Sequence, residues 1–169
     1  MFSLYKIDRL LDKVQESIRE EEYSQALALL KEGEKISPED PYLRMFLGMV
    51  LFHLNDHAAA KTYLEQADSV LKVDAIPGIY LGRILLAEGK PAEALVWFKS
   101  SLKKDRLHPD GHYYSGMAYL GMGKIDEATK EFEMVTAERK EFVLARILAL
   151  LEQKRLNGEA DSSGTGNTR

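Results

Sequence analysis

The sequence predicts an all-α fold made of stacked helix pairs, and three observations support this. Small and bulky apolar residues recur every 34 residues, and a fixed period of this length is typical of a stacked repeat. The recurring positions are Gly48, Gly82 and Gly116; Ala60, Ala94 and Ala128; and Leu64, Phe98 and Phe132. Apolar residues inside each copy follow helical spacing, and each copy is interrupted once, at Asn55, Gly89 or Gly123. The chain has 169 residues, 45% of them hydrophobic, which is enough to bury a sizeable core.

The period divides the chain into four copies, at about residues 7–40, 41–74, 75–108 and 109–142. The first copy is degenerate, because Val14 occupies the glycine position and Lys13 and Ser17 interrupt the apolar face of its first helix. In the third copy we expect a helix from Ile76 that stops near Gly89, and a second helix that begins with proline. The fourth copy predicts the same pair, with a stop at Gly123.

The glycines fall into two classes. Gly89 and Gly123 follow the first helices, where a left-handed backbone conformation ends a helix at little cost. Gly48, Gly82 and Gly116 lie inside first helices, where glycine costs roughly 1 kcal/mol relative to alanine. A cost that recurs indicates a recurring packing requirement. We therefore expect close approach of two helices at these three glycines, with the alanines Ala60, Ala94 and Ala128 opposite them.

Two further segments follow the fourth copy. Residues 141–156 place apolar residues on one face and charges beyond it, which predicts a capping helix over the apolar side of the last repeat. Residues 157–169 are small and polar, and we expect them to be disordered. One domain over residues 1–156 is therefore predicted.

The repeating residues resemble the tetratricopeptide repeat, whose pattern is a tryptophan, a Leu-Gly pair and a tyrosine, then an alanine, a phenylalanine and a proline. The matching positions are Leu47, Gly48, Leu51, Ala60 and Leu64; Leu81, Gly82, Leu85, Ala94 and Phe98; and Gly116, Tyr119, Ala128 and Phe132. The tryptophan position departs from the pattern and holds Arg44, Gly78 and His112. The resemblance covers about residues 7–140. It implies a right-handed superhelical solenoid with a concave groove.

Composition excludes several function classes. The chain has no cysteine, so disulfides and thiolate sites are excluded and a cytoplasmic location is expected. The formal net charge of -4 disfavours a nucleic-acid partner. Charges at Lys6, Asp8 and Arg9 interrupt any apolar signal-peptide core, and no later window is apolar enough for membrane insertion.

No catalytic constellation, cofactor site or metal site is predicted. His53 and His57, like His108 and His112, are four residues apart but do not share one helix, so we expect solvated loop histidines rather than metal ligands. The segment GMGK at 121–124 lacks the spacing of a phosphate-binding loop. Trp97 shares its register with Tyr63, which favours packing between repeats over ligand stacking. We therefore expect no enzyme activity.

The resemblance places a groove on the first helix of each pair and implies which residues line it. They are Tyr42, Met45, Met49, Phe52, Ile76, Ile79, Tyr80, Arg83, Tyr113, Tyr114, Met117 and Leu120. Most are apolar, so the expected partner is an apolar or amphipathic peptide or helix of another protein. The family's clamp for the carboxylate-ended tails of heat-shock proteins uses several cations and asparagines. Only Arg83 is available here, so that partner class is disfavoured.

Three functions remain open at this point. A non-catalytic interaction module or adaptor is the leading hypothesis. A cytosolic chaperone similar in build to those of type III secretion translocators is the second, although the chain lacks an obvious dimerising extension ahead of its repeats. A regulatory subunit or domain associated with an enzyme is the third. The sequence does not identify the partner, the pathway or the oligomeric state.

Overall fold

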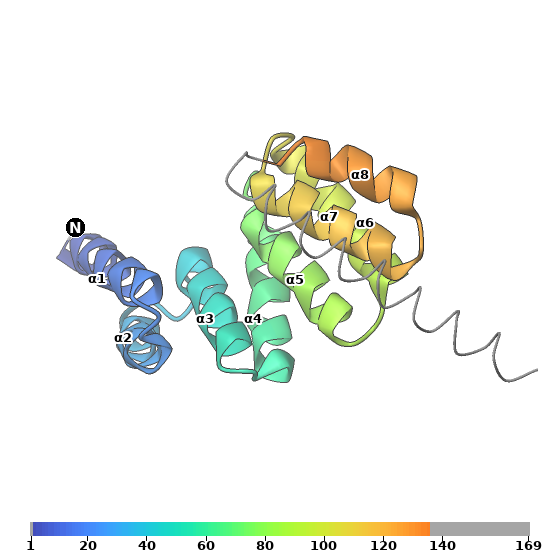
Figure 1. Ribbon diagram of the computed structural model, residues 1–169. Helices are drawn as coiled ribbons and strands as arrows, with labels where there is room; N and C mark the ends of the chain where they lie inside the picture. The colour runs from blue at the N-terminus through green and yellow to red at the C-terminus, as the bar shows by residue number, and fades with distance from the viewer. Residues whose placement is uncertain (1, 136–169) are drawn as a thin grey trace, which may run out of the picture.

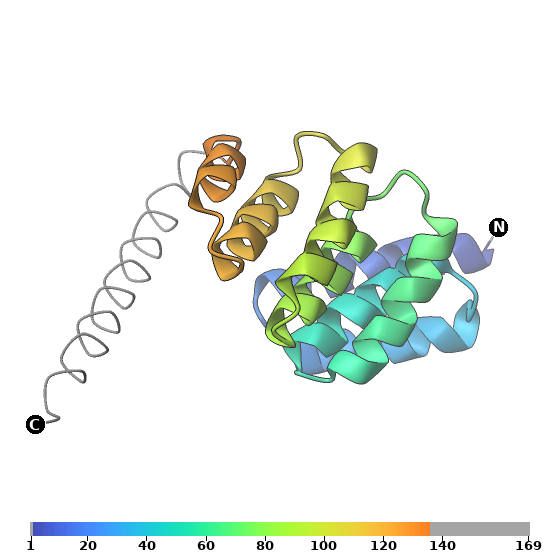
Figure 2. The same cartoon turned by 90° about the vertical axis from the view of Figure 1, so that its right-hand side faces the viewer.

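The computed structural model describes residues 2–135, with side chains from residue 6 onward. This part of the chain contains eight α-helices and no strand. The helices are α1 (Phe2–Arg19), α2 (Tyr23–Ile36), α3 (Pro41–His53), α4 (His57–Val70), α5 (Ile76–Ala87), α6 (Pro91–Lys104), α7 (Pro109–Gly121) and α8 (Ile125–Glu133). They form four consecutive pairs, and Figures 1 and 2 place α1/α2 and α7/α8 at opposite ends of the stack. The prediction of an all-α solenoid of helix pairs is confirmed.

Local signals set the helix starts. The Asp40 side chain accepts hydrogen bonds from the backbone N–H groups of Tyr42 and Leu43, at 2.9 and 3.0 Å, and so caps α3. Asp56 caps α4 in the same way by accepting from the N–H of Ala59 at 3.1 Å. Helices α5, α6 and α7 carry proline in the first turn, where its missing N–H costs nothing.

The turn inside each pair has the same backbone conformation in all four pairs. Glu21, Asn55, Gly89 and Gly123 all have positive φ, at 60°, 63°, 73° and 73°. These four residues are spaced by the 34-residue period, so the first pair uses the same turn as the others. The degenerate copy is therefore a complete helix pair.

The helix glycines make close contacts, but the neighbour differs from the expected alanine. A Cβ atom on Gly82 would overlap the ring of Phe98, and one on Gly116 would overlap the ring of Phe132. At Gly48 the nearest atoms belong to the side chain of Leu64, and the carbonyl oxygen of Ala60 would lie 3.1 Å from the added atom. The nearest contacts of Gly82 and Gly116 therefore come from the large residue four positions after Ala94 and Ala128.

Contacts between helices set the curvature. Among the described helices, the backbones of successive first helices approach one another closely, α1 to α3, α3 to α5 and α5 to α7. Consecutive second helices lie further apart and meet through long side chains, such as Tyr63 with Glu34 and Lys104 with Asp68. The first helices therefore lie on the inside of the curve, and we call the surface they share the inner face. Each first helix also packs on the second helix of the preceding pair, as α3 does when Leu43 and Leu47 cluster with Ala26 and Leu30.

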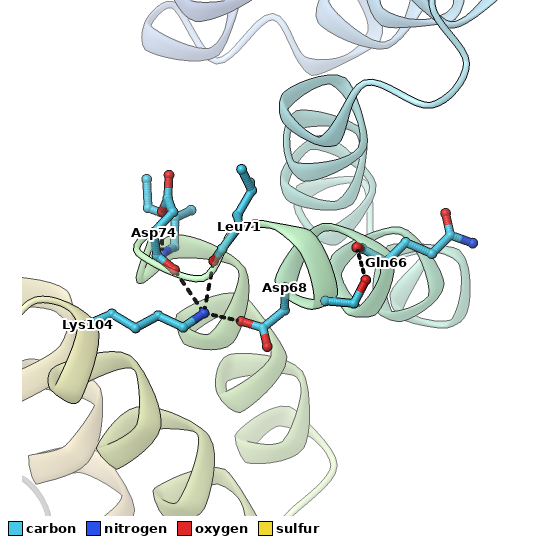
Figure 3. A network of polar contacts seen from close by, with 7 residues as sticks. Gln66, Asp68, Leu71, Asp74 and Lys104 are labelled. Carbon is cyan, nitrogen blue, oxygen red and sulfur yellow. Dashed lines mark hydrogen bonds and ion pairs between the residues drawn. The ribbon is translucent and has the colours of Figure 1, made fainter.

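A polar network ties the third pair to the second (Figure 3). The Lys104 Nζ atom on α6 donates to the Asp68 carboxylate on α4 at 2.6 Å. The same ammonium donates to the carbonyl oxygens of Leu71 and Asp74, at 3.2 and 3.1 Å, in the connection between α4 and α5. One largely buried ammonium group thus holds an irregular segment that has few backbone hydrogen bonds of its own.

The described helices include none long and apolar enough to cross a membrane. The predicted capping helix at 141–156 and the predicted disordered tail at 157–169 lie outside the described residues, as does the end of the fourth copy from residue 136.

Candidate functional site

The inner face carries most of the residues that the sequence predicted for the groove. Tyr42 is exposed over 47% of its surface. The half-buried members are Met49, Phe52, Ile76, Tyr80, Arg83, Tyr113, Tyr114, Met117 and Leu120. Met45 and Ile79 are only 3% and 1% exposed. The assignment of these two to a partner-binding surface is corrected, because their side chains point into the core beneath the inner face.

Met45 and Ile79 are buried for a geometric reason. Met45 clusters with Ala67 and Leu71 at the end of the paired helix α4, whereas Met49, one turn further along α3, packs only partly against that cluster. Residues four apart lie on nearly the same side of a helix, so the difference in burial arises because α3 is tilted against α4 and packs closely only at one end of this row.

A cluster of aromatic rings joins the first three pairs on the inner face. The Tyr23 ring, at the start of α2, stacks on His53 at the end of α3, with centroids 4.5 Å apart and planes at 3°. His53 contacts Tyr80 of α5 through its ring edge and shares a 3.3 Å hydrogen bond with the tyrosine hydroxyl. Phe52 meets the Tyr80 ring edge-on at 5.4 Å. Three helix pairs are therefore connected through a single group of rings.

Arg83 lies at the centre of this surface. Its guanidinium carbon is 4.4 Å from the ring centroids of Phe52 and Tyr80 and 4.8 Å from that of Tyr114. These rings belong to α3, α5 and α7, so the cation contacts three successive first helices. Within residues 6–135, the Arg83 side chain has no carboxylate partner. Cation–π attraction holds the charge in place instead.

The surface continues along α7. The rings of Tyr113 and Tyr114 meet edge-on at 5.0 Å, and Tyr114 also stacks at 6.0 Å on Phe98 of the core. Tyr113, Met117 and Leu120 pack partly against the cluster around Phe132. Each of these side chains therefore has one side on the core and another side on the surface.

Burial changes the ionisation of three groups in the cluster. Burial lowers the pKa of His53 below its usual 6.5, and the nearby Arg83 charge lowers it further. Burial likewise raises the pKa of the Tyr80 and Tyr114 hydroxyls above the usual 10.0. The imidazole is therefore neutral at pH 7 and both phenols are protonated, so Arg83 supplies the positive charge among these ring groups.

Two of the four histidines, His53 and His112, are not solvated loop residues, so the expectation is wrong for these two. His53 is enclosed by aromatic rings, as described above. The His112 Nδ1 atom lies 2.7 Å from the Glu131 carboxylate, its Nε2 lies 2.9 Å from the Arg106 carbonyl oxygen, and its side chain is 11% exposed. Both therefore serve in packing between helices. No group of three His, Asp or Glu residues within the described part of the chain could hold a metal ion.

Trp97 and the GMGK segment take structural positions. Trp97 packs partly against the buried clusters on both sides of α6, which contain Leu85 and Leu81. Gly121 ends α7 and Gly123 forms the turn with positive φ before α8. Sequence reasoning missed Tyr23 and His53 as parts of the inner face. The available signal was that each lies beside a turn inside a helix pair, Tyr23 near Glu21 and His53 near Asn55. His53 also directly follows the groove residue Phe52.

Comparisons with known proteins give a consistent family assignment. A sequence model of the tetratricopeptide repeat matches residues 17–74 and 85–154. A TPR repeat-containing protein of Methanocaldococcus jannaschii is 27% identical over 133 residues, which are 78% of this chain and 23% of that protein. The chain thus spans less than a quarter of the length of this curated relative.

Solved structures show the same fold. The crystal structure of the MamA protein matches with a TM-score of 0.64 and 23% identity, over 83% of this chain and 75% of that one. YrrB, described as a TPR protein with an unusual peptide-binding site, matches with a TM-score of 0.60 and 22% identity, over 86% and 73%. A mutant O-GlcNAc transferase of Thermobaculum terrenum matches with a TM-score of 0.67 and 18% identity, over 70% of this chain but 23% of the enzyme.

The family model covers most of the chain, and the described residues within its matches form helix pairs that have the same positive-φ turn. This fold generally serves as a protein–protein interaction module and not as a catalyst. The chain belongs to the tetratricopeptide repeat family.

Proposed function

We propose that this chain is a non-catalytic adaptor whose inner face binds an apolar or amphipathic segment of a partner protein. The observation that carries the proposal is the row of half-buried aromatic and methionine side chains across α3, α5 and α7. Each has one side fixed by the core, so binding would order few additional side chains and would lose little conformational entropy.

The side-chain chemistry favours an apolar ligand. Met49 and Met117 can adapt their shape to different partners, and tyrosine supplies large contact area from two rotatable bonds. Arg83 is the exception, and its guanidinium already lies over three aromatic rings of this surface. A partner segment with apolar residues at helical or alternate spacing fits this surface better than a highly charged one.

The comparisons are compatible with this proposal. YrrB is described as having a peptide-binding site, and its fold matches most of this chain. The enzyme-associated domain is the second candidate, since a similar solenoid forms part of an O-GlcNAc transferase. A cytoplasmic location is part of the proposal and is supported by the absence of cysteine from the sequence.

Site-specific photocrosslinking tests the proposal. A photoreactive amino acid placed at Tyr42 on the inner face should capture a partner in the native cell, whereas the same amino acid at Lys103 on the outside of α6 should not. Both positions are exposed, so neither replacement should disturb the fold. Mass spectrometry then identifies the captured segment. Capture at Lys103 alone would contradict the inner-face assignment.

A titration with the captured segment provides the quantitative test. Tyr42→Ala should weaken binding by roughly 1 to 2 kcal/mol, as aromatic contacts in interfaces commonly do, and should leave the melting temperature unchanged. We expect little dependence on salt, because screening acts on charges and the inner-face contacts are mostly apolar. A steep fall in affinity with added salt would show that ionic contacts dominate instead.

A further inference from the structure

The first helix pair presents a face that the later pairs bury. In α3, Leu43 and Leu47 are each 1% exposed because they pack against the second helix of the preceding pair. The corresponding residues of α5, Pro77 and Leu81, are buried in the same way. One period earlier, α1 carries Arg9 and Lys13 at these two positions, and both are exposed. α1 therefore keeps the place of a first helix in the stack, but its face at these two positions is basic, whereas the equivalent faces of α3 and α5 are apolar.

This face contains a pocket of about 490 Å³ between α1 and α2. Lys6, Arg9 and Lys13 line one side of it, at the spacing that places them along a single side of α1. The floor is apolar: Leu10 and Leu29 are half-buried, and Ile36 at the end of α2 is 43% exposed. We call these six residues the end face.

The charge of the end face is opposite to that of the whole chain. The chain has a formal net charge of -4, yet the end-face pocket gathers three cations and a single carboxylate, that of Glu32. In the part of the chain that the structure describes, Lys6 and Lys13 form no ion pair. Their charges are therefore available to carboxylates from another molecule.

We propose that the end face binds an acidic amphipathic helix of a partner protein. The helical shape follows from the stack itself, since the equivalent face of α3, α5 and α7 receives a helix from the preceding pair, namely α2, α4 and α6. The partner helix would place its apolar stripe on Leu10, Leu29 and Ile36 and its carboxylates beside Lys6 and Lys13. This site is separate from the inner face and does not depend on the function proposed for it.

The test uses a fluorescein-labelled synthetic peptide with leucine at helical spacing on one face and glutamate on the other. Fluorescence anisotropy with the full chain should show binding at low salt that weakens steeply as salt is added. A matched peptide with lysine in place of glutamate should bind less tightly. The charge-reversal variant Lys6→Glu/Lys13→Glu should lower the affinity for the acidic peptide by about tenfold or more.

Two controls separate the end face from general electrostatics and from folding. The variant Lys72→Glu/Lys103→Glu changes the net charge equally at exposed positions elsewhere, and it should change the affinity by less than about twofold. Ile36→Gln should weaken peptide binding while the melting temperature stays near that of the wild type, because the side chain is partly exposed. Melting curves for each variant establish that the fold is intact.

Three outcomes would overturn the proposal. One is equal affinity of the acidic peptide for the wild type and the Lys6→Glu/Lys13→Glu variant. Another is tighter binding of the lysine peptide than of the glutamate peptide. The third is a dimer in sedimentation velocity that the same reversal dissociates, because the occupant would then be a second copy of this chain. The dependence of affinity on salt also distinguishes the two sites. Added salt should weaken peptide binding at the end face steeply, whereas it should hardly change partner binding at the inner face.

Discussion

The first and third helix pairs achieve the same arrangement with different residues at two positions. In the middle of α5, Gly82 faces the ring of Phe98, which is completely buried. In the middle of α1 the equivalent residue is Val14, also completely buried, together with Leu30 of α2. The space between two paired helices can therefore be filled from both sides or from one side only. Glycine is required only where the facing helix fills the space by itself.

The turns inside the first and third pairs also differ in residue type at equivalent positions. Glu21 in the first pair and Gly89 in the third have positive φ, yet nothing lies within 4 Å of a Cβ atom at Gly89. Side chains are therefore tolerated sterically in the turn, and only the local backbone energy favours glycine there. The helix glycine depends on its neighbours, whereas the turn glycine depends on its own dihedral angles.

The largest expected effect is at the helix glycine of the third pair. Gly82→Leu should lower the free energy of unfolding by about 3 kcal/mol or more, because the new side chain must displace the Phe98 ring in a filled core. Urea denaturation followed by circular dichroism measures the change. Gly89→Leu is the matched control and should cost about 1 to 2 kcal/mol, since only the backbone conformation is affected. Equal losses at both sites would contradict the contrast between the two glycine classes.

The second effect concerns a contact that the third pair has and the first lacks. Lys104→Met should lower the free energy of unfolding by about 2 kcal/mol, because Asp68 loses its partner in a site where the two side chains are only 14% and 24% exposed. The corresponding positions in the second and first pairs are Val70 and Ile36, so the earlier pairs do not contain this ammonium group. Thermal melting should be measured for Lys104→Met and for the control Lys103→Met. Lys103 is exposed, so the control variant should melt like the wild type.

The third effect is a gain in stability at the turn of the first pair. Glu21→Gly should raise the free energy of unfolding by about 1 kcal/mol, because glycine removes the steric cost of the left-handed conformation. Asn55→Gly should give a smaller gain, since asparagine tolerates this conformation better than glutamate. Urea denaturation of both variants tests the order. A loss of stability in Glu21→Gly would show that the glutamate side chain makes a stabilising contact.

The smallest effect is a pH dependence at the link between the first pair and the rest. Since the pKa of His53 is below 6.5 in the folded state, the unfolded state takes up a proton first as the pH falls. Stability should therefore be lost as the pH falls from 6.5 to the lower folded pKa, and this contribution should be fully present above 6.5. Wild type and His53→Gln should be compared by urea denaturation across this window. The variant should lose less stability on acidification, and equal slopes would exclude a role for His53.

The sequence by itself determined the helix pairs and their boundaries. Gly89 and Gly123 mark the turns, Pro91 marks the start of α6, and the 34-residue period carries these assignments to the weaker copies. These are local effects, in which the residue's own backbone preference decides the outcome. The apolar character of the inner face was also predictable, because the periodic positions are mostly aromatic, methionine or aliphatic.

The tertiary structure decided which side chains of that face remain on the surface. Met45 and Ile79 are buried, whereas Met49 and Tyr80 keep an exposed side, because each helix is rotated and tilted to pack on both its partner and the preceding pair. The position of His53 against Tyr23 depends on contacts between residues thirty positions apart. A period of 34 residues fixes the order of the helices but not their rotation, which the volumes of the facing side chains set only when all the pairs are stacked.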